Sequence, residues 1–367
     1  MAGGVSCSPC APLPNSRSRM HNCSPEAFAC LALQTLPKMG DVSVRGLVEA
    51  HGSANAALAS LPPAVVAAAR QSAASSVQLA TRTGAHIVAL PDEHYPARLR
   101  ELRDAPAVLF ARGSVDIAAP PAVAIVGTRT ASGYGLRVAR SIATACARAG
   151  ISVVSGLARG IDGAAHEAAL AAGGRTVAVL GTGIDITYPK SHRLLQERIA
   201  HEGLVLSEQT PGDAGHAGTF PRRNRLIAAL ADVTVVVEAG EGSGALITAD
   251  HAVELGRTVA CVPNAIDVAT ARGSNALLKA HAEPILSPDD VLRLLDMTPS
   301  PTQGPALDGV SARCWHAVQQ GALTPVEVAQ HTGLSTRDAT AVLALLEIDG
   351  LLVFDTSGRI RPTLLGT

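Results

Sequence analysis

The sequence predicts an α/β protein built on an extended, Rossmann-like, doubly wound sheet that is mostly parallel. Short apolar runs alternate with longer helix-like segments from residue 120 to residue 262, which is typical of parallel βαβ units with both sheet faces covered. Gly-rich segments follow most of these runs, as at the ligand-binding edge of such sheets. Helical patterns precede and follow this region, so we expect a small helical domain before the sheet and a winged helix after it.

The expected domain boundaries follow changes in composition and pattern. A stretch rich in Pro, Gly, Ser and Thr separates the sheet region from the last helical pattern and is typical of a linker. We expect a disordered tail at 1–22, a helical domain at 23–82, the Rossmann-like domain at 83–296, the linker at 297–309 and the winged helix at 310–367.

Composition and charge narrow the classes of function. The chain has 367 residues, of which 47% are hydrophobic and 17% charged, so most of it should be globular. The net charge of −1 means that any anion site must be a local patch. No apolar run reaches the ~18 residues of a membrane span, and we expect a cytoplasmic protein with no membrane partner.

The cysteines predict neither a disulfide framework nor a metal site. Seven Cys are present, an odd number, and outside the N-terminus they are scattered. Cys7 and Cys10 have the spacing of metal ligands, but no second pair follows, so we expect a tail there. The first twenty residues also lack the apolar core of a secretory signal. We expect no metal and no cofactor.

The N-terminal pattern predicts four short helices and one strand. A Pro-Lys-Met-Gly turn after Leu36 and a Gly-Ser pair after His51 favour a SAM-like or helix-hairpin-helix bundle, with an ordinary small bundle as the alternative. The expected helices are Glu26–Leu36, Val42–His51, Ala54–Leu61 and Pro63–Leu79, and the expected strand is His86–Leu90.

The central region predicts six further strands and five helices. The expected strands are Val123–Val126, Ser152–Ser155, Thr176–Leu180, Leu204–Ser207, Val233–Val237 and Thr258–Val262. The expected helices are Tyr134–Ala149, Asp162–Ala172, Lys190–His201, Arg223–Leu230 and Ala245–Leu255.

The last sixty residues predict a winged helix-turn-helix. Thr324 precedes a Pro at the first position of a helix, and Ser335 is the expected N-cap of the next helix, Thr336–Asp349. Two short strands, Leu351–Asp355 and Arg359–Arg361, would form the wing.

Four loops at the carboxyl ends of predicted strands favour a phosphate site. Gly residues there free the backbone N–H groups, and the helices that follow present their positive dipole ends. Because the strands are parallel, the loops should meet at one edge of the sheet. Each loop taken alone is also compatible with a plain strand-to-helix turn. The candidate phosphate-binding residues in these loops are Gly127, Arg129, Ser155, Gly156, Arg159, Gly160 and Gly244.

A further loop carries the run Thr219–Arg225, which contains three arginines and no acid. An aromatic ring beside arginines is typical of single-strand binding, where bases stack while arginines follow the backbone. Phe220 could instead be a core residue that covers the next helix. The candidate DNA-binding residues here are Phe220, Arg222, Arg223, Asn224 and Arg225.

Catalytic patterns are weak. Neither G-x-G-x-x-G nor G-x-x-x-x-G-K-[ST] is present. Asp162 and His166 are four residues apart on one predicted helix, and we expect a hydrogen bond on the helix surface rather than a metal site. Glu238 follows a strand at the ligand edge, where it could contact a ribose or act as a base. We expect no catalytic residue.

Taken in order, the motifs resemble those of the DprA/Smf family of DNA-processing proteins. The matching segments are Ile125–Arg129, Ser155–Asp162, Ala178–Gly183, Tyr188-Pro189, Ser207-Glu208, Phe220–Ala228, Val236–Ala239, Ser243–Ala249 and Gly273–Lys279. The resemblance implies a homodimer that binds and protects single-stranded DNA during natural transformation and helps to load the RecA recombinase. It also adds Lys279 to the DNA groove. The chain departs from the family pattern at His192, where Asn is common, and at Ala245, where Ser is common.

Two other functions stay open at this point. The first is a nucleotide-processing enzyme of the phosphoribohydrolase kind, although the P-G-G-x-G-T-x-x-E signature of that group is missing. The second is a transcriptional regulator that acts through residues 310–367. Its second helix carries one Arg and three acids, which suits the major groove of DNA poorly.

Overall fold

The computed structural model describes residues 23–280, 282–298, 307, 309–355 and 357–362. The expected N-terminal tail and most of the expected linker lie outside the described residues. Within these ranges, no helix is long and apolar enough to cross a membrane.

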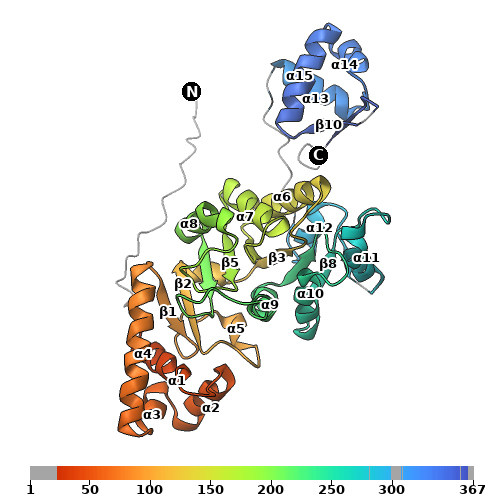
Figure 1. The fold of residues 1–367 in the computed structure, drawn as a ribbon. Helices are drawn as coiled ribbons and strands as arrows, with labels where there is room; N and C mark the ends of the chain where they lie inside the picture. The colour runs from red at the N-terminus through yellow and green to blue at the C-terminus, as the bar shows by residue number, and fades with distance from the viewer. Residues whose placement is uncertain (1–22, 281, 299–306, 308, 356, 363–367) are drawn as a thin grey trace, which may run out of the picture.

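One sheet of nine strands forms the centre of the molecule, in the order β1-β2-β6-β5-β4-β3-β7-β8-β9 (Figure 1). Strands β3 to β9 pair in parallel, while β2 is antiparallel to both β1 and β6. The strands are β1 His86–Ala89, β2 Val108–Gly113, β3 Ala122–Val126, β4 Ser152–Ser155, β5 Thr176–Leu180, β6 Leu204–Ser207, β7 Val233–Val236, β8 Thr258–Cys261 and β9 Glu283–Pro284. The predicted doubly wound, mostly parallel fold is therefore confirmed.

Helices cover both faces of this sheet. Alternate side chains of a strand point to opposite faces, and β3 shows this clearly. Val123 and Ile125 join a core with α6 Gly133–Arg148 and α7 Ile161–Ala171. Ala124 and Val126 join a second core on the other face, which contains residues of α9 and α10. The remaining helices of this region are α5 Ala97–Arg100, α8 Arg193–Glu202, α9 Thr219–Leu230, α10 Gly244–Glu254, α11 Arg272–Lys279 and α12 Pro288–Arg293.

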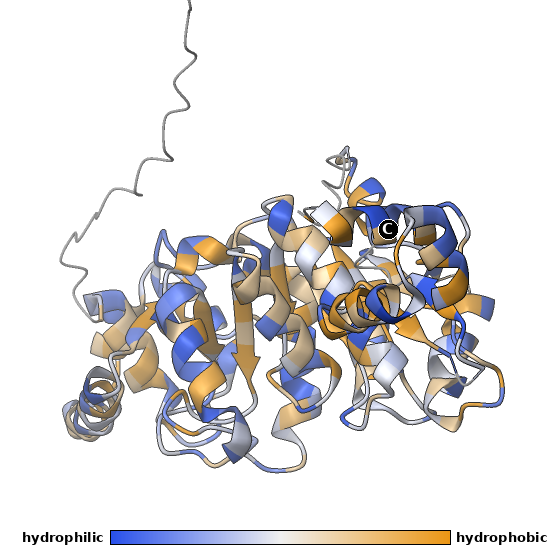
Figure 2. Cartoon of the chain, turned by 90° about the horizontal axis from the view of Figure 1, so that it is seen from above, coloured by the Kyte–Doolittle hydropathy of each residue, from blue (hydrophilic) through white to orange (hydrophobic). Residues whose placement is uncertain are grey.

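Burial on both faces explains why the strand sequences are almost continuously apolar. Figure 2 shows the central strands in hydrophobic colours, while the helices around them alternate between hydrophobic and hydrophilic residues. A helix buries only one stripe against the sheet, whereas a parallel strand between two helix layers buries both sides.

The four N-terminal helices share a core with one end of the sheet, seen at the lower left of Figure 1. Leu33 and Leu58 belong to the same buried cluster as Phe110 of β2 and Ile199 of α8. The helices are α1 Pro25–Gln34, α2 Asp41–His51, α3 Ala54–Ala59 and α4 Pro63–Arg82, and all four were predicted. This shared core ties the helical region to the sheet beside it.

The C-terminal segment has a core of its own. It contains α13 Gly309–Gln319, α14 Pro325–Thr332, α15 Thr336–Ile348 and a hairpin of β10 Leu352–Phe354 with β11 Ile360–Pro362. Thr324 and Ser335 cap the helices α14 and α15, as predicted. The element order is that of a winged helix, and the assignment to that class stays a prediction.

Some elements differ from the sequence prediction. The run Thr219–Arg225 is not in a loop, because α9 begins at Thr219 and not at Arg223. Pro221 is tolerated there, since N–H groups in the first helical turn have no partner within the helix. The expected helix Lys190–His201 is a 3-10 turn at Lys190–His192 followed by α8. The unpredicted elements are β2, α5, α11, β9, α12 and the 3-10 turns at Val115–Ala118 and Ala269–Ala271.

Candidate nucleic-acid interface

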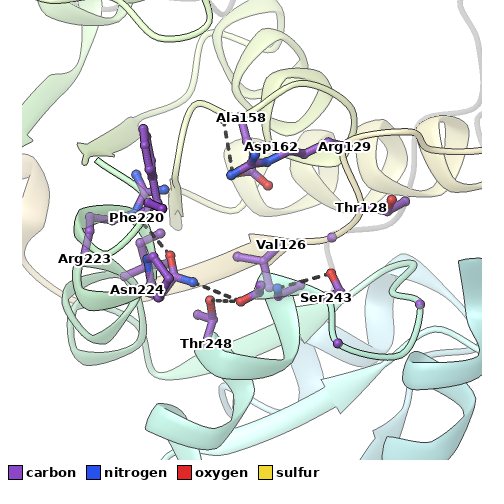
Figure 3. A pocket seen from close by; sticks show the side chains of 18 of the residues that line it. Val126, Thr128, Arg129, Ala158, Asp162, Phe220, Arg223, Asn224, Ser243 and Thr248 are labelled. Atoms are coloured by element: carbon purple, nitrogen blue, oxygen red, sulfur yellow. Dashed lines mark hydrogen bonds between the residues drawn. The ribbon is translucent and has the colours of Figure 1, made fainter. Parts of the chain in front are cut away.

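A pocket of about 1030 Å³ opens at the carboxyl ends of β3 and β7. These neighbouring strands mark the point where the strand order reverses, which is where doubly wound sheets bind ligands. Figure 3 shows α9 side chains on one side of this pocket, Ser243 on the other, and Arg129 and Asp162 between them. Below, "the pocket" means this hollow.

An aromatic pair and an arginine form one wall of the pocket. The rings of Tyr188 and Phe220 have centroids 5.0 Å apart and planes at 45°, and Tyr188 is 50% exposed. The Arg129 guanidinium carbon lies 5.9 Å from the Phe220 ring centroid, within the range of a cation–π contact. Within the described part of the chain, Arg129 forms no ion pair or hydrogen bond to an acidic group. This wall therefore offers stacking surfaces next to an unneutralised cation.

Arg223 and Asp162 hold the loop between β4 and α7 from two sides. The Asp162 carboxylate accepts hydrogen bonds from the N–H groups of Gly156, at 3.1 Å, and Ala158, at 3.3 Å. Arg223 donates to the carbonyl oxygens of Gly156, at 3.0 Å, and Val179. A Cβ on Gly156 would lie 2.6 Å from the Arg223 guanidinium and 2.9 Å from the Asp162 carboxylate, so a larger residue would displace both side chains. Both charged side chains are buried and shape the floor of the pocket.

Burial shifts the pKa values of Asp162 and Arg223. It raises the pKa of Asp162, while Arg223 and the two backbone N–H donors act in the opposite direction. Burial lowers the pKa of Arg223 to about 10, and Asp162 opposes that shift. The guanidinium therefore stays charged at neutral pH and contributes positive potential to the pocket.

The other two arginines of α9 are directed toward the N-terminal part of the molecule. Arg225 is buried and donates to Asp104, at 2.7 Å, and Glu208, at 2.8 Å. Arg222 is 53% exposed in its side chain and pairs with Asp41, the first residue of α2, at 2.9 Å. Arg225 therefore has a structural pairing, whereas Arg222 stays accessible to solvent.

Glu238 ties together two loops that border the pocket. One carboxylate oxygen accepts from the Ser132 hydroxyl, at 2.6 Å, and the Ser132 N–H, at 3.1 Å. The other accepts from the hydroxyl of Thr270. The side chain is fully buried. These contacts occupy the carboxylate that the sequence offered as a possible base.

The loop between β7 and α10 presents free backbone donors. Among the described residues, the N–H groups of Glu241, Gly242 and Gly244 donate to no protein acceptor. The Asn224 amide donates to the Gly244 carbonyl oxygen at 2.9 Å and so anchors α9 to the start of α10. Free N–H groups at the start of a helix favour anions, as the sequence predicted for this loop.

The chain matches a known protein family over most of the region that forms this site. The family model of DNA recombination-mediator protein A matches residues 64–296, more than half of the chain. The chain belongs to this family. The resemblance to DprA/Smf proteins seen in the sequence is thus confirmed.

Several DprA relatives extend this match. A DprA-type DNA processing protein of Mycobacterium tuberculosis is 40% identical over 301 residues, which covers 76% of this chain and 77% of that protein. The crystal structure of DNA processing protein A from Streptococcus pneumoniae has a TM-score of 0.60 and 34% identity, over 73% of this chain and 94% of that one. A Helicobacter pylori DNA processing protein A structure, described for its single-stranded DNA binding mode, has a TM-score of 0.52 and 31% identity, over 58% and 97%.

The structure brings together part of the site that the loops and the arginine run predicted. The predicted residues that line the pocket are Gly127, Arg129, Phe220, Arg223, Asn224 and Gly244. Gly156 lines a small cleft that adjoins the pocket, together with Arg129 and Phe220, and Gly160 lines a second hollow on the far side of Arg129. Ser155, Arg159, Arg222, Arg225 and Lys279 line none of these three. The role of each predicted residue in DNA binding stays a prediction.

Two of the predicted residues that line no hollow, Ser155 and Lys279, have other positions in the fold. Ser155 is fully buried, and its hydroxyl donates to the Ile125 carbonyl oxygen at 2.6 Å, which joins β4 to β3. Lys279 is the last residue of α11 and is exposed.

The expectation for Asp162 and His166 was wrong in its detail. Both are buried, and they have different partners instead of a shared hydrogen bond on the helix surface. His166 Nδ1 lies 2.6 Å from the Thr176 hydroxyl, which itself donates to the Val153 carbonyl oxygen. Nδ1 therefore carries the proton, and the pair anchors α7 to the sheet. In the ranges that the structure covers, no three His, Cys, Asp or Glu side chains form a group suited to a metal.

Sequence reasoning missed some pocket residues of this DprA relative. Thr128, Ser243, Thr248, Thr270 and Arg272 also line it. Arg272 directly precedes the Gly273–Lys279 motif, so its place beside a matched segment was a usable signal. No sequence signal marked Thr270, because it reaches Glu238 only through a 3-10 turn.

Proposed function

We propose that this chain binds single-stranded DNA in the pocket at the carboxyl edge of the sheet. The observation that carries this proposal is the wall of Phe220, Tyr188 and Arg129, where stacking surfaces adjoin an unpaired cation. Single-strand binding proteins combine these two elements, since every base has a face that can stack and every linkage has a charge. The free N–H groups of the loop after β7 offer further donors to phosphate oxygens.

The relatives support the same ligand. The Helicobacter pylori protein, 31% identical to this chain, is described for how it binds single-stranded DNA. The whole-molecule charge of −1 also suits a local groove better than a generally basic surface. Binding should therefore depend on a few arginines at the pocket, such as Arg129, and not on the charge of the whole surface.

The proposal extends to partners. The matched family is described as a recombination mediator, so we infer that the chain protects single strands during DNA uptake and delivers them to the RecA recombinase. A homodimer and a cytoplasmic location belong to the same inference. Light scattering would test the dimer, and recombinase loading onto a strand already coated by a competing binding protein would test the mediator role.

The nucleotide-processing alternative has lost its main candidate base. Glu238 hydrogen-bonds through both carboxylate oxygens and is fully buried. A general base must reach the proton that it takes, and this side chain is held by Ser132 and Thr270. Binding without reaction is the function that the site supports best.

Fluorescence anisotropy with labelled oligo-dT and a matched duplex, at two salt concentrations, tests the proposal. The wild type should prefer the single strand, and Arg129→Ala should weaken binding of strands of different sequence alike, because a phosphate contact carries no base information. The affinity of Arg129→Ala should also depend less steeply on salt concentration, because one phosphate contact is missing.

Arg175→Ala is the matched control. Arg175 is also exposed, but it directly precedes β5 and so lies at the opposite edge of the sheet. If both changes weaken binding equally, general charge and not the pocket determines the affinity, and the proposed site is wrong.

A further inference from the structure

A second hollow lies beside the pocket, on the other side of Arg129. It has a volume of about 310 Å³ and lies between the N-terminal halves of α6 and α7. Three basic side chains and one acidic side chain line it, namely Arg129, Arg140, His192 and Glu167. Arg129 lines both hollows, so the two surfaces are continuous at this residue.

The floor of the second hollow has no bulky side chains. Gly160, Gly163 and Ala164 form it, at the start of α7. A Cβ on Gly160 would lie 2.3 Å from the Thr128 carbonyl oxygen, and one on Gly163 would lie 2.7 Å from the His192 ring. Gly160, whose φ is +78°, therefore requires glycine, whereas a larger residue at Gly163 would have to displace the His192 ring. Small residues here let a ligand approach the protein backbone closely.

The arginines of this hollow are available to a ligand and outnumber its one acidic side chain. Arg140 is exposed on α6 and, within the described residues, forms no ion pair or hydrogen bond. The His192 ring is oriented by its Nδ1, which donates to the Leu157 carbonyl oxygen at 3.0 Å. Glu167, on α7, is the opposing charge of the hollow. The balance of charge therefore favours an anion.

We propose that this hollow binds the sugar–phosphate backbone of the same strand, beyond the segment held in the pocket, with Arg140 as a phosphate contact. The inference rests on the proposed function and extends the DNA path across α6 and α7. A long strand would then occupy both hollows, whereas a short one would fill the pocket alone.

Arg140→Ala tests this with two oligo-dT strands of about 6 and about 20 nucleotides, lengths that span the usual site sizes of single-strand binders. We expect the variant to bind the long strand several-fold more weakly and the short strand as well as the wild type does. For the long strand, the slope of log K against log salt should become shallower by about 0.7, the value for one lost phosphate contact on a single strand.

Two further variants make the test specific. Arg148→Ala removes an equally exposed arginine from the last turn of the same helix, outside the hollow, and should leave both affinities unchanged. Glu167→Gln removes the one acidic charge of the hollow and should strengthen binding of the long strand only.

Each other result overturns the inference. Equal weakening by Arg140→Ala and Arg148→Ala would show a general charge effect, and equal weakening of both strand lengths would place Arg140 at the pocket. An unchanged long-strand affinity in Arg140→Ala would remove the second hollow from the DNA path while leaving the proposed function intact. A wild type that binds neither strand would overturn both proposals.

Discussion

At the scale of single residues, the site separates charges that hold the protein together from charges that are free to bind. Arg223 and Arg225 are buried and hydrogen-bonded, whereas Arg129 is exposed without an acidic partner. Three arginines within one short run look equivalent in the sequence. Only the helical geometry of α9, which starts at Thr219, directs Arg223 and Arg225 inward and leaves Arg222 in solvent.

Arg223→Ala should lower the free energy of unfolding by about 3–5 kcal/mol, because it leaves the buried Asp162 carboxylate without its opposing charge. Urea unfolding measures this effect. Arg129→Ala is the control and should change the unfolding free energy by no more than about 0.5 kcal/mol, as for an exposed residue without partners. If the two variants are equally stable, Arg223 has no structural role.

The buried His166 predicts a dependence of stability on pH. Burial lowers its pKa from 6.5 to about 3, and the nearby charges of His192 and Arg223 act in the same direction. The folded state therefore binds this proton less readily than the unfolded chain, and the unfolding free energy should fall as the pH falls from about 6.5 toward 3. One such group contributes a slope of at most about 1.4 kcal/mol per pH unit.

His166→Gln removes the titrating group and should flatten this part of the stability profile. Urea unfolding of both proteins across this pH range, compared as the difference between the two curves, isolates the contribution of His166. Parallel curves for the variant and the wild type would show that the histidine does not titrate in this way.

At the scale of elements, the sequence predicted the strands better than the ends of the helices. β4, β5 and β6 lie where the apolar runs predicted them, because a strand buried on both faces needs a short continuous apolar segment. β2 was missed although it contains the same kind of short apolar run, Ala107–Ala111, because that run lies before the region where strands and helices alternate. The start of α9 was missed because Pro221 resembles a loop residue.

The contact between α9 and α2 predicts a gain in DNA affinity. Asp41→Asn would remove the 2.9 Å ion pair of Arg222, leaving only its longer contact with Glu208 at 3.9 Å, and would keep an amide oxygen for the Ala107 N–H, which donates to Asp41 at 3.0 Å. We expect stronger binding of oligo-dT with a steeper salt dependence, because one more arginine becomes free for phosphate. Because the Arg222 side chain is 53% exposed, its ion pair should stabilise by about 1 kcal/mol or less, and the melting temperature should change little.

Anisotropy titration at two salt concentrations is the measurement, with Arg222→Ala/Asp41→Asn as the control. The gain should disappear in the double variant, since the freed side chain is gone. A gain that persists without Arg222 would have to come from the lost negative charge alone.

At the scale of the whole molecule, the sequence predicted that loops meet at one sheet edge, but not which side chains meet there. Parallel strands bring Gly127 and Gly244 to the same edge whatever the strand order. The order itself places β7 beside β3, and this adjacency creates the pocket between their loops. No local pattern in the sequence contains that pairing. Arg159 was predicted from its Gly-rich loop and Lys279 from a matched motif, and neither pattern shows in which direction a side chain points.

The separate core of the C-terminal segment predicts that it folds independently. Truncation after residue 298 should leave the unfolding transition of the sheet region unchanged, because the buried cluster of α13–α15 contains no residue of the sheet. Calorimetry of the full and truncated chains would show this. Oligo-dT affinity should also be retained, and its loss would assign part of the DNA site to the C-terminal segment.

The central claim is that single-stranded DNA lies against Phe220 and Tyr188 in the pocket. Photo-cross-linking of a strand that carries halogenated uracil, followed by mass spectrometry of the peptides, locates the contact directly. We predict adducts on Phe220 or Tyr188, the paired aromatic rings of the pocket, and their loss in Phe220→Leu/Tyr188→Leu. Adducts confined to α14 and α15, with none at the pocket, would contradict the account.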